Sequence, residues 1–265
     1  ALDHEHFLGT ELTQIAGEKA GIIKKNVPVI SASQTKEVEQ TLCEKAREMD
    51  TLIFFEGADF IWEQIGTGEV RLECDDKVFT LPKPSLVGPH QIQNAALAAA
   101  SIIYSDYLTP LDDRLFSGIG FAKWSGRVQF INQGKLLNHR GARPIWIDGA
   151  HNSHGATALA ASLAQITDEK WTLIVGMLNT RKPVDIFIPL KNLINEIFTI
   201  TIPGQPASLS AEELSDNCQD LGIKANAKSS LSAALSASSD SEFVIICGSL
   251  YLAGHALLLN DTLPE

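Results

Sequence analysis

Residues 144–176, PIWIDGAHNSHGATALAASLAQITDEKWTLIVG, decide the fold of the C-terminal half. The apolar run at 145–148 is short enough for a buried strand, and the small-residue stretch near 154–166 has the length and composition of a helix. A second apolar run follows at 171–176. Short apolar strands separated by helices are typical of a parallel sheet that is covered by helices on both faces.

The same alternation extends from this stretch to the C-terminus. Further strands are expected at 197–202 and 243–247, and further helices near 185–196, 210–221 and 229–237 and from Ser249 onward. The C-terminal half is therefore predicted to be an α/β domain with a mainly parallel sheet.

The N-terminal half has a different pattern. Helices are expected at 10–24, 35–49 and 91–104, and strands at 27–30 and 51–55. From 58 to 82 the apolar residues alternate with a period of two, and Gly-rich or acidic turns separate the runs, which predicts an antiparallel meander. The stretch 117–143 is rich in glycine and basic residues, and we interpret it as the connection between two domains.

The composition is that of a globular chain, and it excludes several classes of protein. Of the 265 residues, 45% are hydrophobic and 20% are charged, and the net charge is −11. A chain this acidic lacks the basic surface needed for general binding of nucleic acid. The four cysteines form no C-x-x-C pair, and no apolar run has the length of a membrane span, so we expect a cytoplasmic protein with reduced thiols and no membrane partner. The chain starts at Ala1 and not at Met, which we interpret as the mark of a fragment.

Lys19 stands out because it lies on the apolar stripe of the first predicted helix, three residues after Ala16 and three before Ile22. A buried ammonium group is unfavourable unless it is paired or neutralised. From the helix pattern alone, a lysine whose head reaches solvent is the favoured interpretation. The alternative is a lysine of lowered pKa that reacts as the neutral amine. His4 lies just before this helix, and a loop could fold it back toward Lys19.

Six segments resemble, in the same order, the landmarks of the folylpolyglutamate and dihydrofolate synthases. They are LDHEHFLGTELTQIAGEKAGIIKKNVPVI (2–30), GPHQIQNAALAAA (88–100), WSGRVQ (124–129), IDGAHNSHGA (147–156), GMLNTRK (176–182) and GSLYLAG (248–254). These synthases belong to the Mur-type ligases. The resemblance implies the C-terminal part of a central ATPase domain over 1–126, with a mixed sheet, followed by a Rossmann-like ligase domain over 127–265.

The resemblance also implies roles for residues of the N-terminal half. His4 corresponds to a histidine that binds magnesium. Lys19 corresponds to a carbamylated lysine, whose added carboxylate is a suitable oxygen ligand for a hard cation and helps to place the metal and the phosphate. Asn94 corresponds to an asparagine that contacts the adenine nucleotide, although its place near a helix start would by itself favour a packing role.

In the C-terminal half, the resemblance assigns Arg127 to the nucleotide phosphates, Asp148 to the nucleotide, and His151 to a position beside ATP and the incoming amino acid. Exposed N–H groups at Ser249, with Tyr251 beside it, could hold an anion such as a glutamate carboxylate. Ordinary roles remain open for three of these residues: a solvated loop arginine at 127, a helix-capping aspartate at 148 and an N-cap serine at 249.

The implied reaction is amide formation between a folate or dihydropteroate carboxylate and L-glutamate, by a monomer that uses ATP and Mg²⁺. The glycine-rich P-loop of these synthases, G-T-N-G-K-G-S, is absent from the 265 residues. Because that loop would hold the ATP phosphates, the chain by itself is expected to be inactive. A cell-wall Mur ligase that acts on a nucleotide-sugar peptide, and a non-catalytic binding module, are the alternatives.

Overall fold

The computed structural model describes residues 11–105 and 113–262. The chain divides into two compact units. The first runs to Ser85 and again from His90 to Lys123, and the second comprises Leu86–Pro89 and the chain from Trp124 onward. The final passage into the second unit lies close to the predicted boundary after residue 126, whereas the short segment of the second unit before His90 was not predicted. The assignment of the two parts to named domains stays a prediction.

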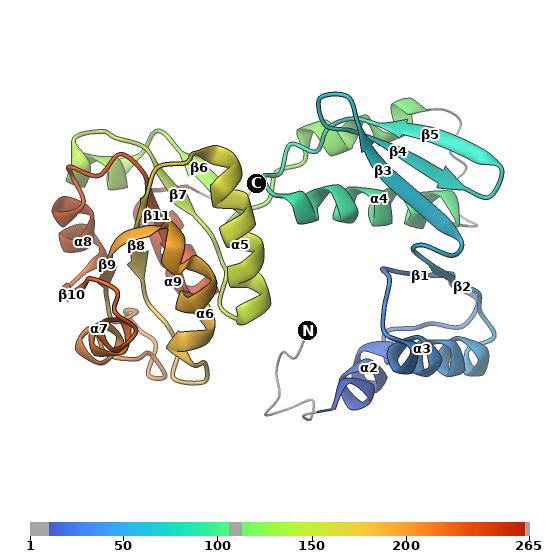
Figure 1. Ribbon diagram of the computed structural model, residues 1–265, viewed down its shortest axis with the longest axis horizontal. Coiled ribbons are helices and arrows are strands. Elements are labelled where there is room, and N and C mark those ends of the chain that lie inside the picture. The colour runs from blue at the N-terminus through green and yellow to red at the C-terminus, as the bar shows by residue number, and fades with distance from the viewer. Residues whose placement is uncertain (1–10, 106–112, 263–265) are drawn as a thin grey trace. The chain divides into compact units, whose positions relative to one another are not determined.

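The first unit contains a parallel strand pair and an antiparallel meander (Figure 1). Its elements are α2 (Leu12–Ala20), β1 (Val29–Ser31), α3 (Lys36–Glu48), β2 (Ile53–Phe55), β3 (Phe60–Ile65), β4 (Glu69–Cys74), β5 (Lys77–Leu81), α4 (Pro89–Ile103, which belongs to this unit from His90 on) and a 3₁₀ helix (Asp113–Phe121). β1 pairs with β2 in parallel, and β4 pairs with both β3 and β5 in antiparallel register. The predicted meander over 58–82 is therefore confirmed.

The meander and α4 share one hydrophobic core. In β4 every second side chain is buried (Val70, Leu72 and Cys74), and these residues form one cluster with the small buried residues of α4, among them Ala96 and Ala100. Alanine at the buried positions allows the helix to lie close to the sheet. The alternating buried residues of the strands thus pack against the Ala-rich face of α4.

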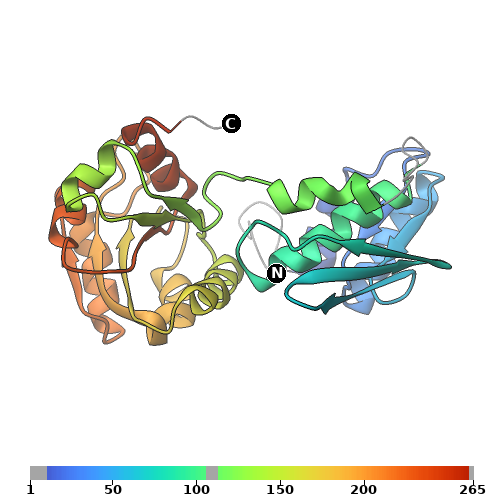
Figure 2. The ribbon, with the colours of Figure 1, turned by 90° about the horizontal axis from the view of Figure 1, so that it is seen from above.

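The second unit is a six-stranded sheet with helices on both faces (Figure 2). Its elements are β6 (Gln129–Ile131), a 3₁₀ helix (Lys135–Arg140), β7 (Ile145–Ile147), α5 (Ser153–Ile166), β8 (Trp171–Val175), α6 (Pro183–Leu190), a 3₁₀ turn (Lys191–Leu193), β9 (Ile194–Thr199), α7 (Ala211–Asp220), β10 (Ala225–Ala227), α8 (Leu231–Ala237), β11 (Val244–Cys247) and α9 (Leu250–Leu259). The strand order is β10-β9-β8-β11-β7-β6, and only β6 is antiparallel to its neighbour. The predicted α/β class with a mainly parallel sheet is confirmed.

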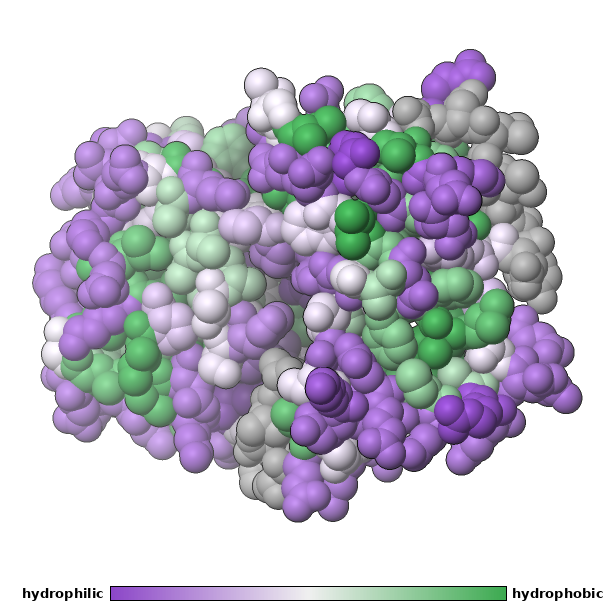
Figure 3. Space-filling view, turned by 45° about the vertical axis from the view of Figure 1, so that its right-hand side comes forward, coloured by the Kyte–Doolittle hydropathy of each residue, from purple (hydrophilic) through white to green (hydrophobic). Residues whose placement is uncertain are grey.

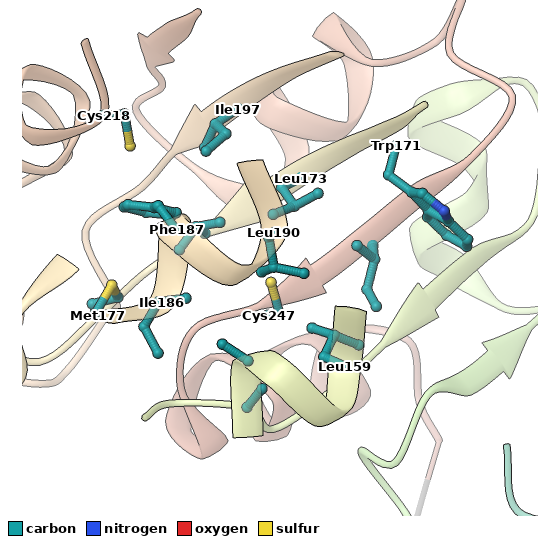
Figure 4. Packing of buried hydrophobic residues seen from close by; sticks show 14 of the residues in the cluster. Leu159, Trp171, Leu173, Met177, Ile186, Phe187, Leu190, Ile197, Cys218 and Cys247 are labelled. Atoms are coloured by element: carbon teal, nitrogen blue, oxygen red, sulfur yellow. The ribbon is translucent and has the colours of Figure 1, made fainter. Parts of the chain in front are cut away.

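The central strands bury side chains on both faces, as their continuous apolar sequence requires. In β11, Ile245 and Cys247 belong to the cluster that α5, α6 and α7 cover, whereas Val244 and Ile246 belong to the cluster that the second 3₁₀ helix, α8 and α9 cover. Figure 4 shows residues of the first cluster, among them Leu159 of α5, Leu190 of α6 and Cys247 of β11.

Four expectations about individual elements were wrong. The expected helix at 185–196 ends at Leu190, one residue after Pro189, and β9 begins at Ile194, earlier than the expected 197. A proline inside a helix removes a hydrogen bond and brings the helix to an end. Residues 225–227 form an edge strand that the sequence Ala-Asn-Ala did not signal. Part of the predicted connection at 117–143 is β6 and a 3₁₀ helix of the second unit, and its start lies in a 3₁₀ helix of the first.

Hydrophilic and hydrophobic residues are interspersed on the face of the molecule shown in Figure 3. Among the helices of the described residues, none is both long and apolar enough to cross a membrane.

The four cysteines should differ sharply in reactivity. Cys74, Cys218 and Cys247 are buried, and all four cysteines are free thiols. Burial raises the pKa of Cys74 to about 11 and that of Cys218 to about 12, and it raises the pKa of Cys247 as well. Because the thiolate is the reactive form, only the half-buried Cys43 is expected to react rapidly with a thiol reagent at neutral pH. Native protein should titrate one fast thiol and denatured protein four; a second fast thiol in the native protein would contradict this packing.

Candidate functional site

The carboxyl ends of three neighbouring strands meet at one edge of the sheet in the second unit. β7, β11 and β8 lie side by side in parallel, in that order. The helix after β7, α5, packs on one face of the sheet, and the helix after β11, α9, packs on the other. Connections that leave two adjacent strands in opposite directions create the position at which α/β sheets bind ligands. We therefore place the candidate site at the carboxyl ends of β7 and β11.

Asp148 directly follows β7 and has only 6% of its surface exposed. Its Oδ2 accepts a hydrogen bond from the Val128 N–H at 2.8 Å, and its Oδ1 accepts one from the Ala150 N–H at 2.7 Å. Burial raises the pKa of Asp148 above its ordinary value of 3.8, and the two N–H bonds and the charges of Arg127 and His151 act in the opposite direction. The carboxylate thus joins the loop before β6 to the loop after β7.

The start of α5 is capped by another residue. Asn152 is the N-cap, and its Oδ1 accepts a hydrogen bond from the Gly155 N–H at 2.7 Å. The alternative role of Asp148 as the helix cap is therefore wrong, because its own oxygens bond to Val128 and Ala150. His151 is half-buried, with Nδ1 2.9 Å from the Gly149 carbonyl oxygen. A carbonyl can only accept, so Nδ1 carries the proton in this bond and Nε2 of the neutral ring is left as an acceptor.

Arg127 is an exposed residue between two buried ones. Gly126 has φ 70° and Val128 has φ 45°. The Gly126 carbonyl accepts a hydrogen bond from the Gly149 N–H at 2.8 Å. Arg127 itself reaches toward Gly149, since its Nη1 lies 3.4 Å from the place that a Cβ on Gly149 would occupy. The guanidinium group is thus at the carboxyl end of β7, close to Asp148.

The loop after β11 completes this edge of the sheet. The Gly248 N–H donates to the Ala150 carbonyl at 3.0 Å, which joins this loop to the one after β7. Ser249 is the N-cap of α9: it is buried, and its Oγ accepts a hydrogen bond from the Tyr251 N–H at 3.0 Å. Tyr251 has 54% of its side chain exposed. The hydroxyl group of Ser249 therefore serves as an ordinary N-cap. Of Ser249 and Tyr251, Tyr251 is the one exposed to solvent.

These residues can bind an anion and move a proton. The exposed guanidinium of Arg127 presents donors that suit phosphate or carboxylate oxygens. Nε2 of His151 has no proton when Nδ1 donates to the Gly149 carbonyl, so it can accept one. The sequence-predicted residues that the structure brings together are Arg127, Asp148, His151 and Ser249.

Asn94 belongs to the first unit and lies on α4. Its side chain is exposed, and its Nδ2 donates to the Oε1 of Gln91 at 3.0 Å. Gln91 is almost fully buried, so this bond fixes the amide of Asn94 at the surface of the helix. An amide held in this way can present its oxygen to a ligand.

Lys19 has the environment that the favoured interpretation of the helix pattern predicted. The apolar contacts of α2 are made by Ile15, Ala16 and Ala20, whereas the Lys19 side chain is exposed. Its place in the last turn of a short helix allows the side chain to reach solvent, as the favoured interpretation held. The role of Lys19 as a carbamylated metal ligand stays a prediction. His4, predicted as its metal-binding partner, lies outside the described residues.

Sequence reasoning missed Glu56, which follows β2 and accepts three hydrogen bonds. Its Oε1 accepts a hydrogen bond from Trp62 Nε1 at 2.5 Å, and its Oε2 accepts from Gln93 Nε2 at 2.7 Å and from the Ser33 N–H at 3.1 Å. One carboxylate thus ties β3, α4 and the loop after β1 together, next to Asn94. A single acidic residue in a turn gives no signal of such a role. Gln129, which bonds to the Gly126 N–H, was also missed.

The comparisons with known proteins agree with this architecture. Residues 135–259 match the family described as "Dihydrofolate synthetase, C-terminal domain". The folylpolyglutamate synthase of Lacticaseibacillus casei is 29% identical over 266 residues, which cover 96% of this chain and 58% of that protein. The crystal structure of Mycobacterium tuberculosis folylpolyglutamate synthase complexed with ADP and AMPPCP superposes with a TM-score of 0.83 at 26% identity, covering 100% of this chain and 63% of that one.

A bifunctional folylpolyglutamate synthase/dihydrofolate synthase with Mn, AMPPNP and L-glutamate bound superposes with a TM-score of 0.79 at 26% identity. The superposition covers 97% of this chain and 59% of that one. The chain therefore spans less than two thirds of the length of these relatives.

The fold and the site together define a Mur-ligase-like α/β protein, with its candidate site at the carboxyl ends of the strands. The motifs, the matched domain and the structural relatives all indicate the same group of Mur-type ligases. Residues 135–259 match the C-terminal domain of dihydrofolate synthetases, and the relatives that match nearly the whole chain are folylpolyglutamate and dihydrofolate synthases. These similar proteins are ligases, and the predicted resemblance is confirmed.

Proposed function

We propose that this chain is part of an ATP-dependent ligase that joins L-glutamate to dihydropteroate or to folates. In that reaction ATP phosphorylates the acceptor carboxylate, and the amine of glutamate displaces phosphate from the acyl phosphate. The observation that carries the proposal is the grouping of Arg127, Asp148 and His151 at the carboxyl ends of β7 and β11. It is supported by the similarity of the chain to folylpolyglutamate and dihydrofolate synthases.

Arg127 is the residue that we assign to the nucleotide phosphates. Its guanidinium is exposed, lies over Gly149 and can form two parallel hydrogen bonds to phosphate oxygens. We assign Asp148 to holding the surrounding loops and to the nucleotide. His151, with its Nε2 available, would accept a proton from the ammonium group of glutamate and so leave the free amine that attacks the acyl phosphate. Ser249 and Tyr251 are the proposed neighbours of the amino-acid carboxylate.

In the first unit, Asn94 would present its amide to the adenine ring. His4 and a carbamylated Lys19 are the proposed metal ligands, and Mg²⁺ would neutralise phosphate charge. Among the described residues, no group of three His, Cys, Asp or Glu side chains could hold a metal ion. The exposed amine of Lys19 can react with carbon dioxide to form a carbamate. The described residues do not by themselves fit a metal site.

The related structures support the substrates that we propose. One relative holds L-glutamate with AMPPNP and Mn, and another holds ADP with AMPPCP. We propose a monomeric cytoplasmic protein, in keeping with its four free thiols.

The role of Arg127 can be tested with a single substitution. Arg127→Ala is expected to weaken ADP binding by about 10- to 100-fold, because a charge-assisted bidentate contact contributes about 1.5–3 kcal/mol. Isothermal titration calorimetry on the 265-residue chain measures the affinity, and thermal unfolding shows whether the fold is kept. Since Arg127 is exposed, the midpoint should not change.

Arg143→Ala is the matched control, because Arg143 is an exposed arginine of the same unit that bonds to the Ser239 carbonyl. Equal ADP affinity in the Arg127 and Arg143 variants would refute the phosphate role. The substrate class is tested separately on a version expressed together with the coding region upstream of Ala1, by measuring ADP release with dihydropteroate, folates and a nucleotide-sugar peptide. Turnover with the last substrate alone would favour a cell-wall ligase instead.

A further inference from the structure

The loop that carries Arg127 is anchored on both sides of this residue. On the N-terminal side, the Gly126 carbonyl accepts from the Gly149 N–H at 2.8 Å. On the C-terminal side, the Val128 N–H donates to Asp148 at 2.8 Å. Arg127 is the exposed residue between the two anchors. We call the stretch 126–129 the arginine loop.

The backbone of this loop is in a conformation that its sequence does not favour. Val128 has φ 45°, in the left-handed region, where a β-branched side chain is a clear outlier. Its side chain is 5% exposed and belongs to the core cluster on the α5 face of the sheet. Such a conformation persists only when the surroundings hold it in place, and it is found most often at functional sites.

Gln129 provides a bond that closes the loop. Its Oε1 accepts a hydrogen bond from the Gly126 N–H at 3.0 Å, across the turn that contains Arg127. Gly126 is buried, so without this acceptor its N–H would be left unsatisfied. Gln129 is also the first residue of β6, where it pairs with Ile147 of β7, immediately before Asp148. Its backbone is therefore fixed to the sheet, and its side chain holds Gly126 in place relative to the sheet.

We propose that Gln129 is a positioning residue for Arg127. It holds the left-handed arginine loop closed, so that the guanidinium is pre-set over Gly149 before a ligand arrives. The relevance of this to nucleotide binding rests on the phosphate role proposed for Arg127. Pre-ordering a side chain removes part of the entropy cost of binding, so the loop contributes affinity without touching the ligand.

Three substitutions separate the acceptor from the rest of the side chain. Gln129→Met keeps a similar length but has no strong acceptor, whereas Gln129→Glu keeps an acceptor for the Gly126 N–H. Gln133→Ala is the control, since Gln133 is an exposed glutamine of the same unit that offers only its backbone carbonyl, to Asn260. If Gln129→Met fails to fold, Gln129→Asn, which draws the acceptor back by one methylene, takes its place.

The first readout needs no ligand. Amide hydrogen exchange of Gly126 and Val128, and the ¹⁵N order parameter of Arg127, are measured by NMR on the 265-residue chain. We expect Gln129→Met to speed exchange at Gly126 by about tenfold or more and to lower the order parameter, whereas Gln129→Glu and Gln133→Ala behave like the wild type. Unchanged exchange and order in Gln129→Met would overturn the proposal.

The second readout is a double-mutant cycle on ADP affinity with Arg127→Ala. If Gln129 acts through Arg127, Gln129→Met weakens ADP binding by about three- to tenfold in the wild-type background and has no effect once Arg127 is alanine. An equal loss in both backgrounds would show that Gln129 acts on its own, and it would overturn the proposal. If Arg127→Ala leaves ADP affinity unchanged, the phosphate role fails, and the exchange data still decide whether Gln129 holds the loop.

Discussion

Replacement of Asp148 by alanine is expected to lower the free energy of unfolding of the second unit by about 2–5 kcal/mol. The carboxylate is buried and accepts one hydrogen bond from the Val128 N–H and one from the Ala150 N–H. Removing it leaves two buried donors without partners, and each costs about 1–3 kcal/mol. Val128 would also lose one of the contacts that keep it at φ 45°. The loss should appear in hydrogen exchange of the slowest amides of β8 and β11, which report on this unit alone.

Asp216→Ala is the matched control, because Asp216 is an exposed aspartate on α7, and its loss should change stability by less than about 0.5 kcal/mol. Asp148→Asn keeps one acceptor and should fall between the alanine variant and the wild type. An Asp148→Ala protein as stable as the control would show that these two bonds do not hold the loops.

The effect of Asp148 also depends on pH, with a sign that follows from its raised pKa. A carboxyl whose pKa is higher in the folded state binds a proton more tightly there than in the unfolded chain. Its contribution to stability is therefore largest below the ordinary pKa of 3.8 and declines as pH rises through the raised value. The stability difference between wild type and Asp148→Ala should be larger at about pH 4 than at about pH 7.

The sequence predicted the regular parts of the fold because those elements have strong local patterns. The alternation in β3, β4 and β5 and the continuous apolar runs of β8 and β11 each follow from one period of burial. The errors fall where local pattern and tertiary packing diverge. β10 is a strand because it pairs with β9 at the edge of the sheet, and Ala-Asn-Ala shows no preference for that state.

The candidate site was predictable in part for a related reason. Asp148 and His151 follow a recognisable strand, and the rule that ligands bind at strand ends is sufficient to select them. Two of the bonds that anchor the loop of Arg127, to Asp148 and to Gly149, join residues about twenty apart in the sequence. In addition, a valine at φ 45° contradicts its own local preference. Lys19 was predictable from its length: it lies on the apolar stripe of α2, but a long side chain in a last helical turn can reach solvent, as the favoured interpretation held.

Three glycines around the site should respond to alanine in three different ways, and Gly248 should respond most strongly. It has φ 100°, and an added Cβ would lie 2.6 Å from Val175 Cγ1 and 3.0 Å from the Gly176 carbonyl oxygen. Val175 is fully buried in β8 and cannot move aside. Backbone strain and overpacking together should lower the free energy of unfolding of the second unit by about 3–5 kcal/mol.

Gly149→Ala should be tolerated, although its added Cβ meets another atom even more closely. That atom is Cδ2 of Leu250, at 2.3 Å, and the Leu250 side chain is 53% exposed and can rotate away. We expect a stability loss below about 1.5 kcal/mol, together with weaker ADP binding, because the displaced leucine and the new methyl group both lie beside Arg127 Nη1.

Gly254 completes the series as the control, since it lies inside α9 and an added Cβ would meet nothing within 4 Å. Alanine there should stabilise the second unit by about 0.5–1 kcal/mol, because glycine is a poor helix former. Hydrogen exchange of β8 and β11 ranks the three variants on one scale. If Gly149→Ala proved more destabilising than Gly248→Ala, the freedom of the neighbouring side chain to move would not determine the cost of the added methyl group. The close packing of Gly248 against Val175 and Gly176 would then not be what holds the carboxyl ends of β8 and β11 in place.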